Sequence, residues 1–377
     1  MKNNRFLAGS RFYLLTFLPA LLLLFTSGCQ KNIDNTAARS GSHELAIGKP
    51  AKMLKDFTQV NLVGNNDEYG AAHIDAHLLN AWGIAFSSGG TAWVSSQGGG
   101  VSTVYNKDGV AQAISPVAIP SPGGPSGGNP TGQVFNSSSD FKLPNGNPAR
   151  FIFDGVDGII SGWNGGAAAI KKIDRSGHSV YTGLAIGNDA GANFLYAADF
   201  ASGKIDVIDK DWVLVNKPFT DPDLPAGYSP FNIQNLGGKL YVMYAKVGDD
   251  GEEEAHPGAG VVDVYNTDGS LVKRLVTGGQ LNAPWGVAMA PASFFADDAV
   301  TEPHILVGNF GDGTINAYNM DGQWLGVLRA HGAPIVIEGL WAISFAPTTA
   351  TAVNPNWLYF AAGPDDEEDG LFGYITK

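Results

Sequence analysis

The sequence is nearly devoid of cysteine and lacks the short motifs that mark several large enzyme classes. Cys29 is the only cysteine among 377 residues, so no disulfide can form within the chain. The sequence also contains no Walker phosphate loop, no dinucleotide-binding fingerprint and no cysteine pair with metal-site spacing. We therefore expect neither a disulfide framework nor a bound nucleotide cofactor.

Positive charge is also scarce. The chain has 23 Lys and Arg against 36 Asp and Glu, which gives a formal net charge of −13. A surface of this sign repels nucleic acid and anionic lipid headgroups and weakly attracts cations. Nucleic acid is therefore not an expected partner, and contact with a membrane is not expected to come from a basic patch.

The apolar run at residues 12–25 is too short to be a convincing membrane span. It follows three basic residues, as the apolar core of a secretory signal does. It leads into Thr-Ser-Gly-Cys at residues 26–29, which resembles a bacterial lipobox. We predict a signal peptide at 1–28 that is removed and a lipid attached to Cys29. An ordinary signal peptide with an incidental cysteine is the alternative.

These predictions imply where the protein is located in the cell and how it is attached to a membrane. Removing residues 1–28 takes away three of the 23 basic residues and none of the 36 acidic ones, leaving a formal charge of −16. Residues 29–55 are polar and are predicted to be a flexible tether between the anchor and the folded body. We expect an exported protein of the cell envelope, held to a bacterial membrane only through its lipid and facing the periplasm or the exterior.

A short phrase that begins with an aromatic residue or threonine recurs about every 50 residues. Its copies are Trp82-Gly83, Thr131-Gly132, Thr182-Gly183, Phe231-Asn232, Trp285-Gly286 and Trp341-Ala342. Strand-like repeats of this period are typical of a β-propeller. The 50 glycines and 11% aromatic residues also favour an all-β fold. Six repeats predict a six-bladed β-propeller at residues 56–377, in which the aromatic residues pack between blades.

Hairpin turns divide each repeat into four antiparallel strands. Asp108-Gly109, Asp268-Gly269 and Asp321-Gly322 are turn dipeptides before a fourth strand, and Ser176-Gly177 is predicted to do the same in the second blade. The sixth repeat ends after its third strand, at residues 370–375. Because an exposed strand edge invites aggregation, we predict that residues 57–63 supply the missing strand and close the ring.

Oxygen-bearing side chains are predicted at one end of the propeller axis. Asn80, Asn129, Asn282 and Glu338 precede or open innermost strands. This arrangement resembles that of calcium-dependent six-bladed lactonases and phosphotriesterases, in which the metal polarises a substrate oxygen. It makes these four residues candidate ligands of calcium. A channel that simply holds water is the alternative.

Two further features could contribute to a site on the same face. Acidic runs at residues 249–254 and 365–369 fall in equivalent loops of the fourth and sixth blades. They are either solvated surface loops or sources of oxygen ligands for a hard cation. His331 is predicted in a loop that reaches this face, so His331 and Glu338 are the candidate catalytic residues.

Several longer phrases resemble a family of exported bacterial proteins with NHL-like six-bladed propellers. They include residues 80–85 (Asn-Ala-Trp-Gly-Ile-Ala), 130–136 (Pro-Thr-Gly-Gln-Val-Phe-Asn) and 309–317 (Asn-Phe-Gly-Asp-Gly-Thr-Ile-Asn-Ala). The resemblance extends from about residue 57 to the end of the chain. It implies the fold and export, and it implies no activity.

Two functions of different classes follow from these features. The first is a non-catalytic binding module, expected to be a monomer, whose acidic loops take a glycan, peptide or protein ligand. The second is a calcium-dependent hydrolase of the lactonase or esterase type, with its site at the mouth of the axial channel. We favour the first, because acidic and amide side chains alone do not define a reaction.

Overall fold

The computed structural model describes residues 52–297 and 300–377, which belong to one compact unit, residues 50–377. The predicted signal peptide, Cys29 and most of the predicted tether lie outside the described residues. The 3-10 helix η1 (Lys52–Leu54) packs Met53 and Leu54 into the core. The folded unit therefore begins a few residues before position 56. Within the described residues, no helix has the length and apolar character needed to cross a membrane.

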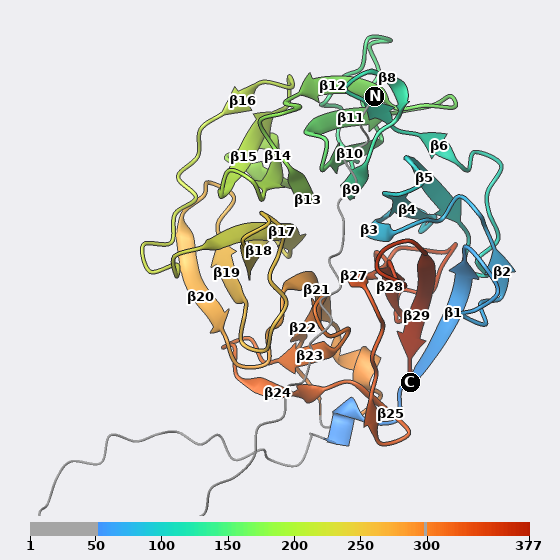
Figure 1. The fold of residues 1–377 in the computed structure, drawn as a ribbon, viewed down its shortest axis with the longest axis vertical. Helices are drawn as coiled ribbons and strands as arrows, with labels where there is room; N and C mark the ends of the chain where they lie inside the picture. The colour runs from blue at the N-terminus through green and yellow to red at the C-terminus, as the bar shows by residue number, and fades with distance from the viewer. Residues whose placement is uncertain (1–51, 298–299) are drawn as a thin grey trace, which may run out of the picture. The chain divides into compact units, whose positions relative to one another are not determined.

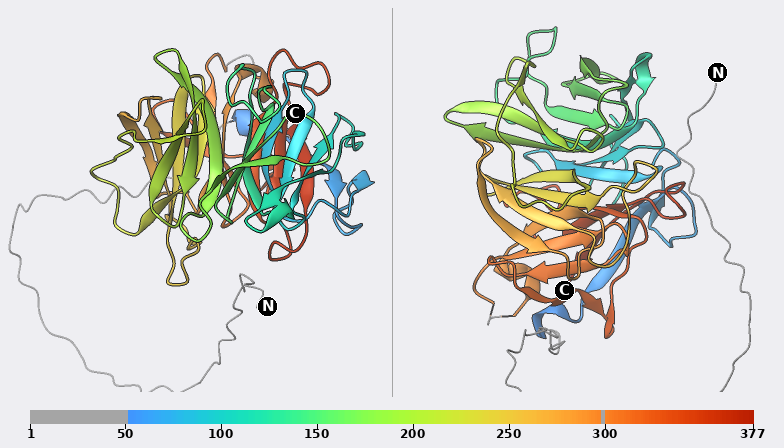
Figure 2. Two further views of the ribbon diagram at one scale, coloured as in Figure 1. Left: turned by 90° about the horizontal axis from the view of Figure 1, so that it is seen from above. Right: turned by 60° about the vertical axis from the view of Figure 1, so that its left-hand side comes forward.

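Six antiparallel sheets surround a central axis, as the sequence predicts (Figure 1). In each sheet the strands follow one another in chain order from the axis outward, apart from the strand that closes the ring. The connections between strands project from the two faces of the ring (Figure 2). The fold is a six-bladed β-propeller of four-stranded blades.

The first three blades are built from consecutive strands. Blade 1 contains β3 (Ala81–Phe86), β4 (Ala92–Ser96), β5 (Val101–Tyr105) and β6 (Val117–Ala118). Blade 2 contains β9 (Pro130–Phe135), β10 (Phe151–Gly155), β11 (Ile159–Trp163) and β12 (Ile170–Asp174). Blade 3 contains β13 (Tyr181–Asp189), β14 (Ala192–Asp199), β15 (Lys204–Asp209) and β16 (Leu214–Val215).

The last three blades follow the same plan. Blade 4 contains β17 (Tyr228–Leu236), β18 (Lys239–Lys246), β19 (Val261–Tyr265) and β20 (Leu271–Thr277). Blade 5 contains β21 (Pro284–Ala290), β22 (His304–Asn309), β23 (Ile315–Tyr318) and β24 (Trp324–Val327). Blade 6 contains β27 (Leu340–Phe345), β28 (Leu358–Ala362), β29 (Leu371–Thr376) and a strand from the other end of the chain.

That closing strand is β1 (Thr58–Gly64), which pairs antiparallel with β29 and aligns Val60 with Tyr374. Figure 1 shows the two strands side by side. The predicted ring closure is therefore confirmed. A short strand, β2 (His73–Ile74), adds to the outer edge of β1 in parallel and makes this sheet five-stranded, which the sequence did not predict.

Three short pieces lie in connections outside the blade strands, two of them between blades and one, the 3-10 helix η2 (Ala292–Phe295), between β21 and β22 of blade 5. The other two are the hairpin β7 (Pro120–Ser121) with β8 (Gly124–Gly127) and the hairpin β25 (Arg329–Ala330) with β26 (Ala333–Pro334). One predicted turn is misplaced. Ser176-Gly177 follows β12, the fourth strand of blade 2, and leads into blade 3, because the third strand of blade 2 lies earlier in the chain than its sequence suggested.

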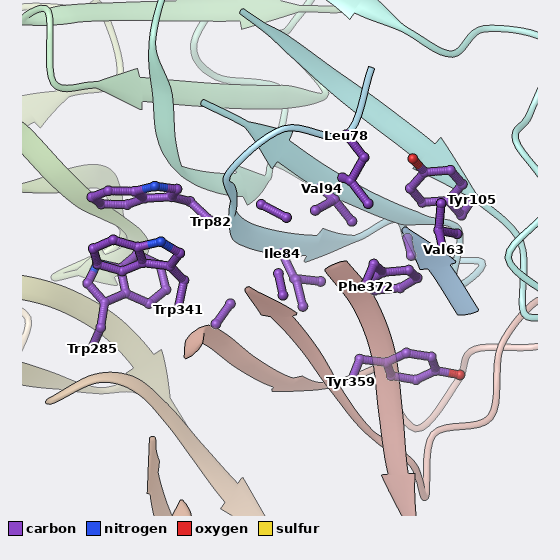
Figure 3. Close-up of a cluster of buried hydrophobic side chains, with 14 of the residues drawn as sticks. Val63, Leu78, Trp82, Ile84, Val94, Tyr105, Trp285, Trp341, Tyr359 and Phe372 are labelled. Atoms are coloured by element: carbon purple, nitrogen blue, oxygen red, sulfur yellow. The ribbon is translucent and has the colours of Figure 1, made fainter. Parts of the chain in front are cut away.

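Aromatic side chains from the repeated phrase fill the axis of the ring. The rings of Trp82 and Trp341 stack with centroids 3.5 Å apart, and Trp285 meets both of them edge-on at 6.0 Å (Figure 3). The indole Nε1 of Trp285 in blade 5 donates to the backbone oxygen of Thr182 in blade 3 at 2.8 Å. Because blades 3 and 5 are not neighbours, this bond joins the two sides of the axis.

The glycine of the phrase lies where the innermost strands of neighbouring blades touch. A Cβ added to Gly83 would collide with the backbone oxygen of Thr131, and one added to Gly132 would collide with the backbone nitrogen of Leu184. Backbone atoms of a central strand cannot move aside cheaply. The phrase therefore combines an axial side chain with a point of close approach between strands.

Gly83→Ala tests this packing. We expect it to destabilise the fold by about 1–3 kcal/mol, the usual cost of overpacking a dense core, and to lower the melting temperature. Gly123→Ala is the control, because a Cβ at Gly123 meets nothing within 4 Å. Equal melting temperatures for the two variants would contradict the proposed contact.

Candidate functional site

A polar group lies above the axial tryptophans, where loops of blades 1, 2, 4 and 6 meet. We call it the mouth group, and its members are Asn80, Gln97, Asn129, Glu253 and Glu367. Glu253 lies in the β18–β19 loop and Glu367 in the β28–β29 loop, which are the equivalent loops predicted from the two acidic runs. Asn80 Nδ2 donates to Glu367 Oε2 at 2.6 Å. Asn80 therefore connects the mouth group to the axial core.

A hydrogen bond from the axial core fixes the orientation of the side-chain amide of Asn80. Trp341 Nε1 lies 2.9 Å from Asn80 Oδ1, and an indole N–H can only donate. The amide oxygen must therefore face the core, and the amide nitrogen faces Glu367. In this arrangement Asn80 presents a hydrogen-bond donor, not a metal-ligating oxygen, to the mouth group.

Gln97 links the first two blades. Its Oε1 accepts from Asn80 Nδ2 at 3.2 Å, and its Nε2 donates to Asn129 Oδ1 at 3.4 Å. The backbone nitrogen of Asn129 donates in turn to Asp157 Oδ2 at 3.3 Å. Burial raises the pKa of Asp157, although these hydrogen bonds oppose the shift. The hydrogen-bonded series Asn80, Gln97 and Asn129 thus ends at the carboxyl group of Asp157.

The carboxyl groups of the mouth group resist ionisation. Burial raises the pKa of Glu253 to about 8, and repulsion from Glu367 adds to the shift. Burial likewise raises the pKa of Glu367, with repulsion from Glu252, while the hydrogen bond from Asn80 opposes it. In the part of the chain that the structure describes, no ion pair joins Glu253 or Glu367 to a basic side chain. Both carboxyl groups therefore lack a counter-ion.

The backbone that carries Glu367 is strained. Asp365, Asp366 and Glu367 are consecutive residues with φ of 56°, 51° and 67°, in the left-handed region that residues with a Cβ avoid. Each such residue costs on the order of 1 kcal/mol, and strain of this kind gathers at functional sites. The loop thus holds Glu367 in place at the expense of stability.

The four residues predicted to bind calcium make different hydrogen bonds. Asn80 and Asn129 share the network through Gln97, and Glu338 Oε1 accepts from the backbone nitrogen of Asp365 at 3.3 Å. Asn282 instead bonds within blade 5, where its Nδ2 donates to Asp312 Oδ2 at 3.3 Å. Asn80 stands two residues before its tryptophan and Asn282 three before Trp285, so they are not equivalent in the repeat.

His331 lies elsewhere in the structure. It is exposed at the tip of the β25–β26 hairpin, in which the backbone oxygen of Arg329 accepts a hydrogen bond from the backbone nitrogen of Phe57 at 2.9 Å. Among the described residues, no hydrogen bond connects His331 to the mouth group. Nor do the described residues contain a group of three or more His, Cys, Asp or Glu arranged to hold a metal ion. Calcium binding and a catalytic role for His331 or Glu338 stay predictions.

The sequence did not single out three members of the mouth group. Gln97 follows the second strand of blade 1 with no motif to mark it, and Glu253 and Glu367 are single members of long acidic runs. The sequence signal for Glu253 and Glu367 was that the two acidic runs, 249–254 and 365–369, occupy equivalent loops of their blades.

Fold and site together define a six-bladed β-propeller with an acidic, amide-lined group on its axis. The chain is 34% identical to uncharacterized protein L690 of Acanthamoeba polyphaga mimivirus, an alignment that covers 85% of this chain and 86% of that protein. It is 31% identical to uncharacterized protein R648 of the same virus, over 85% of this chain and 80% of that protein. The chain belongs to the family that includes these two proteins.

These relatives are viral, so the bacterial and NHL-like parts of the resemblance rest on the sequence phrases alone. No family model matches the chain. Among solved structures, virginiamycin B lyase from Staphylococcus aureus is similar with a TM-score of 0.49 and 12% identity, over 85% of this chain and 99% of that one. A putative gluconolactonase is similar with a TM-score of 0.36 and 13% identity, over 79% of each chain. At these values the likeness carries nothing about activity.

Glu253→Gln tests the electrostatics of the mouth group. Since the folded-state pKa of Glu253, about 8, lies above its ordinary 4.5, the stability that its proton contributes is complete below pH 4.5 and is lost as the pH rises through 8. We expect Glu253→Gln to match the wild type near pH 4.5 and to melt at a progressively higher temperature than the wild type up to pH 9.

Glu254→Gln is the matched control. Glu254 pairs with Lys246 at 2.6 Å, and the hydrogen bond from Lys246 lowers the pKa of Glu254. Its contribution is present above its ordinary pKa, and His256, 3.4 Å from Glu254, adds to it only where the imidazole is protonated. Glu254→Gln should therefore melt no higher than the wild type at any pH between 5 and 9. A difference between Glu253→Gln and wild type that does not grow over this range would contradict the raised pKa.

Proposed function

We propose that the protein is a binding module whose mouth group takes a positively charged group of a peptide or protein ligand. The observation that carries this proposal is the pair Glu253 and Glu367, two carboxyl groups with raised pKa values and no basic partner within the described residues. A ligand ammonium or guanidinium group would supply the missing counter-charge. Glu253 and Glu367 would then each make a charge-assisted hydrogen bond to the ligand in a partly desolvated site.

Three further features support a basic ligand. The formal charge of −13 would attract it from a distance. The amide oxygens of Gln97 and Asn129 accept from Asn80 and Gln97, and each keeps a second lone pair that such a ligand could use. The strained loop that holds Glu367 also fits a preorganised binding site. Of the glycan, peptide and protein ligands expected from the sequence, the charge of the mouth group favours a peptide or protein segment that contains lysine or arginine.

Export and anchoring belong to the same proposal. The signal-like residues 1–28 and the lipobox-like sequence before Cys29 support an exported, lipid-anchored protein. An anchored monomer with its binding face on a rigid ring would capture ligands close to the membrane that carries it. The membrane contact in this account is made by the lipid alone.

A calcium-dependent hydrolase is the second candidate. The interaction of Glu253 with Glu367 favours it, because calcium binds carboxylate oxygens. The orientation of Asn80 weighs against it, since the oxygen of that amide is committed to Trp341. A metal site would need Asn80 to turn or other oxygens to take its place.

Titration with a short peptide that contains two lysines tests the first candidate. We expect saturable binding by calorimetry, and no binding of the same peptide with glutamate in place of lysine. Glu367→Gln should weaken the lysine peptide about tenfold or more, because a hydrogen bond to a charged group contributes about 1.5–3 kcal/mol. Glu368→Gln, which removes the same charge from the exposed neighbour, should change binding less than about twofold.

Calcium separates the two candidates. If calcium raises the melting temperature of chelator-treated wild type but not of Glu367→Gln, and the lysine peptide does not bind, the second candidate replaces the first. Peptide binding that is equal in Glu367→Gln and Glu368→Gln would remove the mouth group as the site.

A further inference from the structure

A concave site lies at the seam where the ring closes, and none of its lining residues belongs to the mouth group. It is a pocket of about 340 Å³ between the closing strands β1 and β2 and the outer part of blade 1. Its walls include Val63 of β1, Ile74 of β2, Tyr105 of β5 and Pro116 from the connection to β6. The pocket exists only because the N-terminal segment is seated against blade 1.

The polar side of the pocket is an ordered arrangement of three side chains. Tyr105 donates its hydroxyl to Asp75 Oδ2 at 2.9 Å, and both the backbone nitrogen and Nδ1 of His77 lie 3.0 Å from Asp75 Oδ1. Figure 3 shows Tyr105 beside Val63 at this seam. Because a carboxylate accepts and does not donate, His77 carries its proton on Nδ1.

The hydrogen bond to Asp75 therefore sets the tautomer of His77 that a ligand would meet. With the proton on Nδ1, the neutral imidazole presents a hydrogen-bond acceptor at Nε2. Within the described residues, no hydrogen bond occupies Nε2, and the side chain of His77 is 60% exposed. The carboxylate fixes both the tautomer and the position of the ring, as a buried second partner of a functional histidine does.

The other side of the pocket is apolar and open to solvent. Ile74 is 62% exposed and Val110 45% exposed, and both line the pocket. Ile114, 46% exposed, lies next to Ser115, which also lines it. Exposed large apolar side chains gathered around a concave site are typical of a ligand-binding surface. The volume is at the lower end of the range for small-molecule sites.

We propose that this seam pocket binds a small neutral ligand that has an apolar body and a hydroxyl group. The apolar body lies against Ile74, Val110 and Pro116, and the hydroxyl group donates to His77 Nε2. An anionic head group is disfavoured because Asp75 lies directly behind His77 and the chain has a formal charge of −13. This site is separate from the proposed binding of basic ligands at the mouth group, and neither depends on the other.

The probe is p-cresol, a methylated phenol, and its partners are 4-methylanisole, which lacks the hydroxyl proton, and benzoate, which is anionic. In ligand-observed NMR titrations we expect p-cresol to bind wild type with a Kd on the order of 1 mM. The anisole should bind about fivefold more weakly, because it cannot donate a hydrogen bond to Nε2. His77→Ala should remove this difference between the two probes, and His178→Ala, at an exposed histidine elsewhere, should preserve it.

Val110→Asp tests the apolar wall without touching His77. It should weaken both neutral probes, and its melting temperature shows whether the seam stays folded. The proposal is overturned if wild type shows no saturable binding of p-cresol, if p-cresol binds His77→Ala as it binds wild type, or if benzoate binds more tightly than p-cresol.

Discussion

The meeting of six innermost strands around one axis is the constraint on which the rest of the structure depends. Three of these strands bring a tryptophan to the axis, and neighbouring strands approach each other closely at the glycines of the phrase. Trp82, Trp285 and Trp341 fill the axis, and the bond from Trp285 to the carbonyl of Thr182 joins blades 5 and 3, which are not neighbours in the ring. Glycine at the contact, as at Gly83, removes the side chain that would keep the strands apart.

The axial packing also shapes the site. Trp341 donates to the oxygen of Asn80, which turns the nitrogen of that amide toward Glu367. Trp341, which packs in the axial core, thereby makes Asn80 a hydrogen-bond donor toward the mouth group. Desolvation by the surrounding loops then raises the pKa values of Glu253 and Glu367, which is the observation behind the proposed cationic ligand.

The sequence predicted the ring well, because its evidence is local. Strand alternation and Asp-Gly turns each act over a few residues, the repeat can be read along the chain, and the strand-like segment at β1 could fill the open edge of β29. The site was predicted less well, because it depends on which loops meet across the axis. A shift of one residue separates Asn282 from the position of Asn80, and no local signal chooses Glu253 or Glu367 from an acidic run. The pocket at the seam is lined in part by β2, a two-residue strand that is too short to show a strand pattern in the sequence.

Proton release on ligand binding is the measurement that tests the central claim most directly. At pH 7 Glu253, with a pKa of about 8, is mostly protonated, and a positive ligand group beside it favours the carboxylate. The enthalpy of binding the lysine peptide, measured in buffers of different ionisation enthalpy, should therefore show the release of about one proton in wild type and much less in Glu253→Gln. A binding enthalpy that is the same in every buffer would contradict the account.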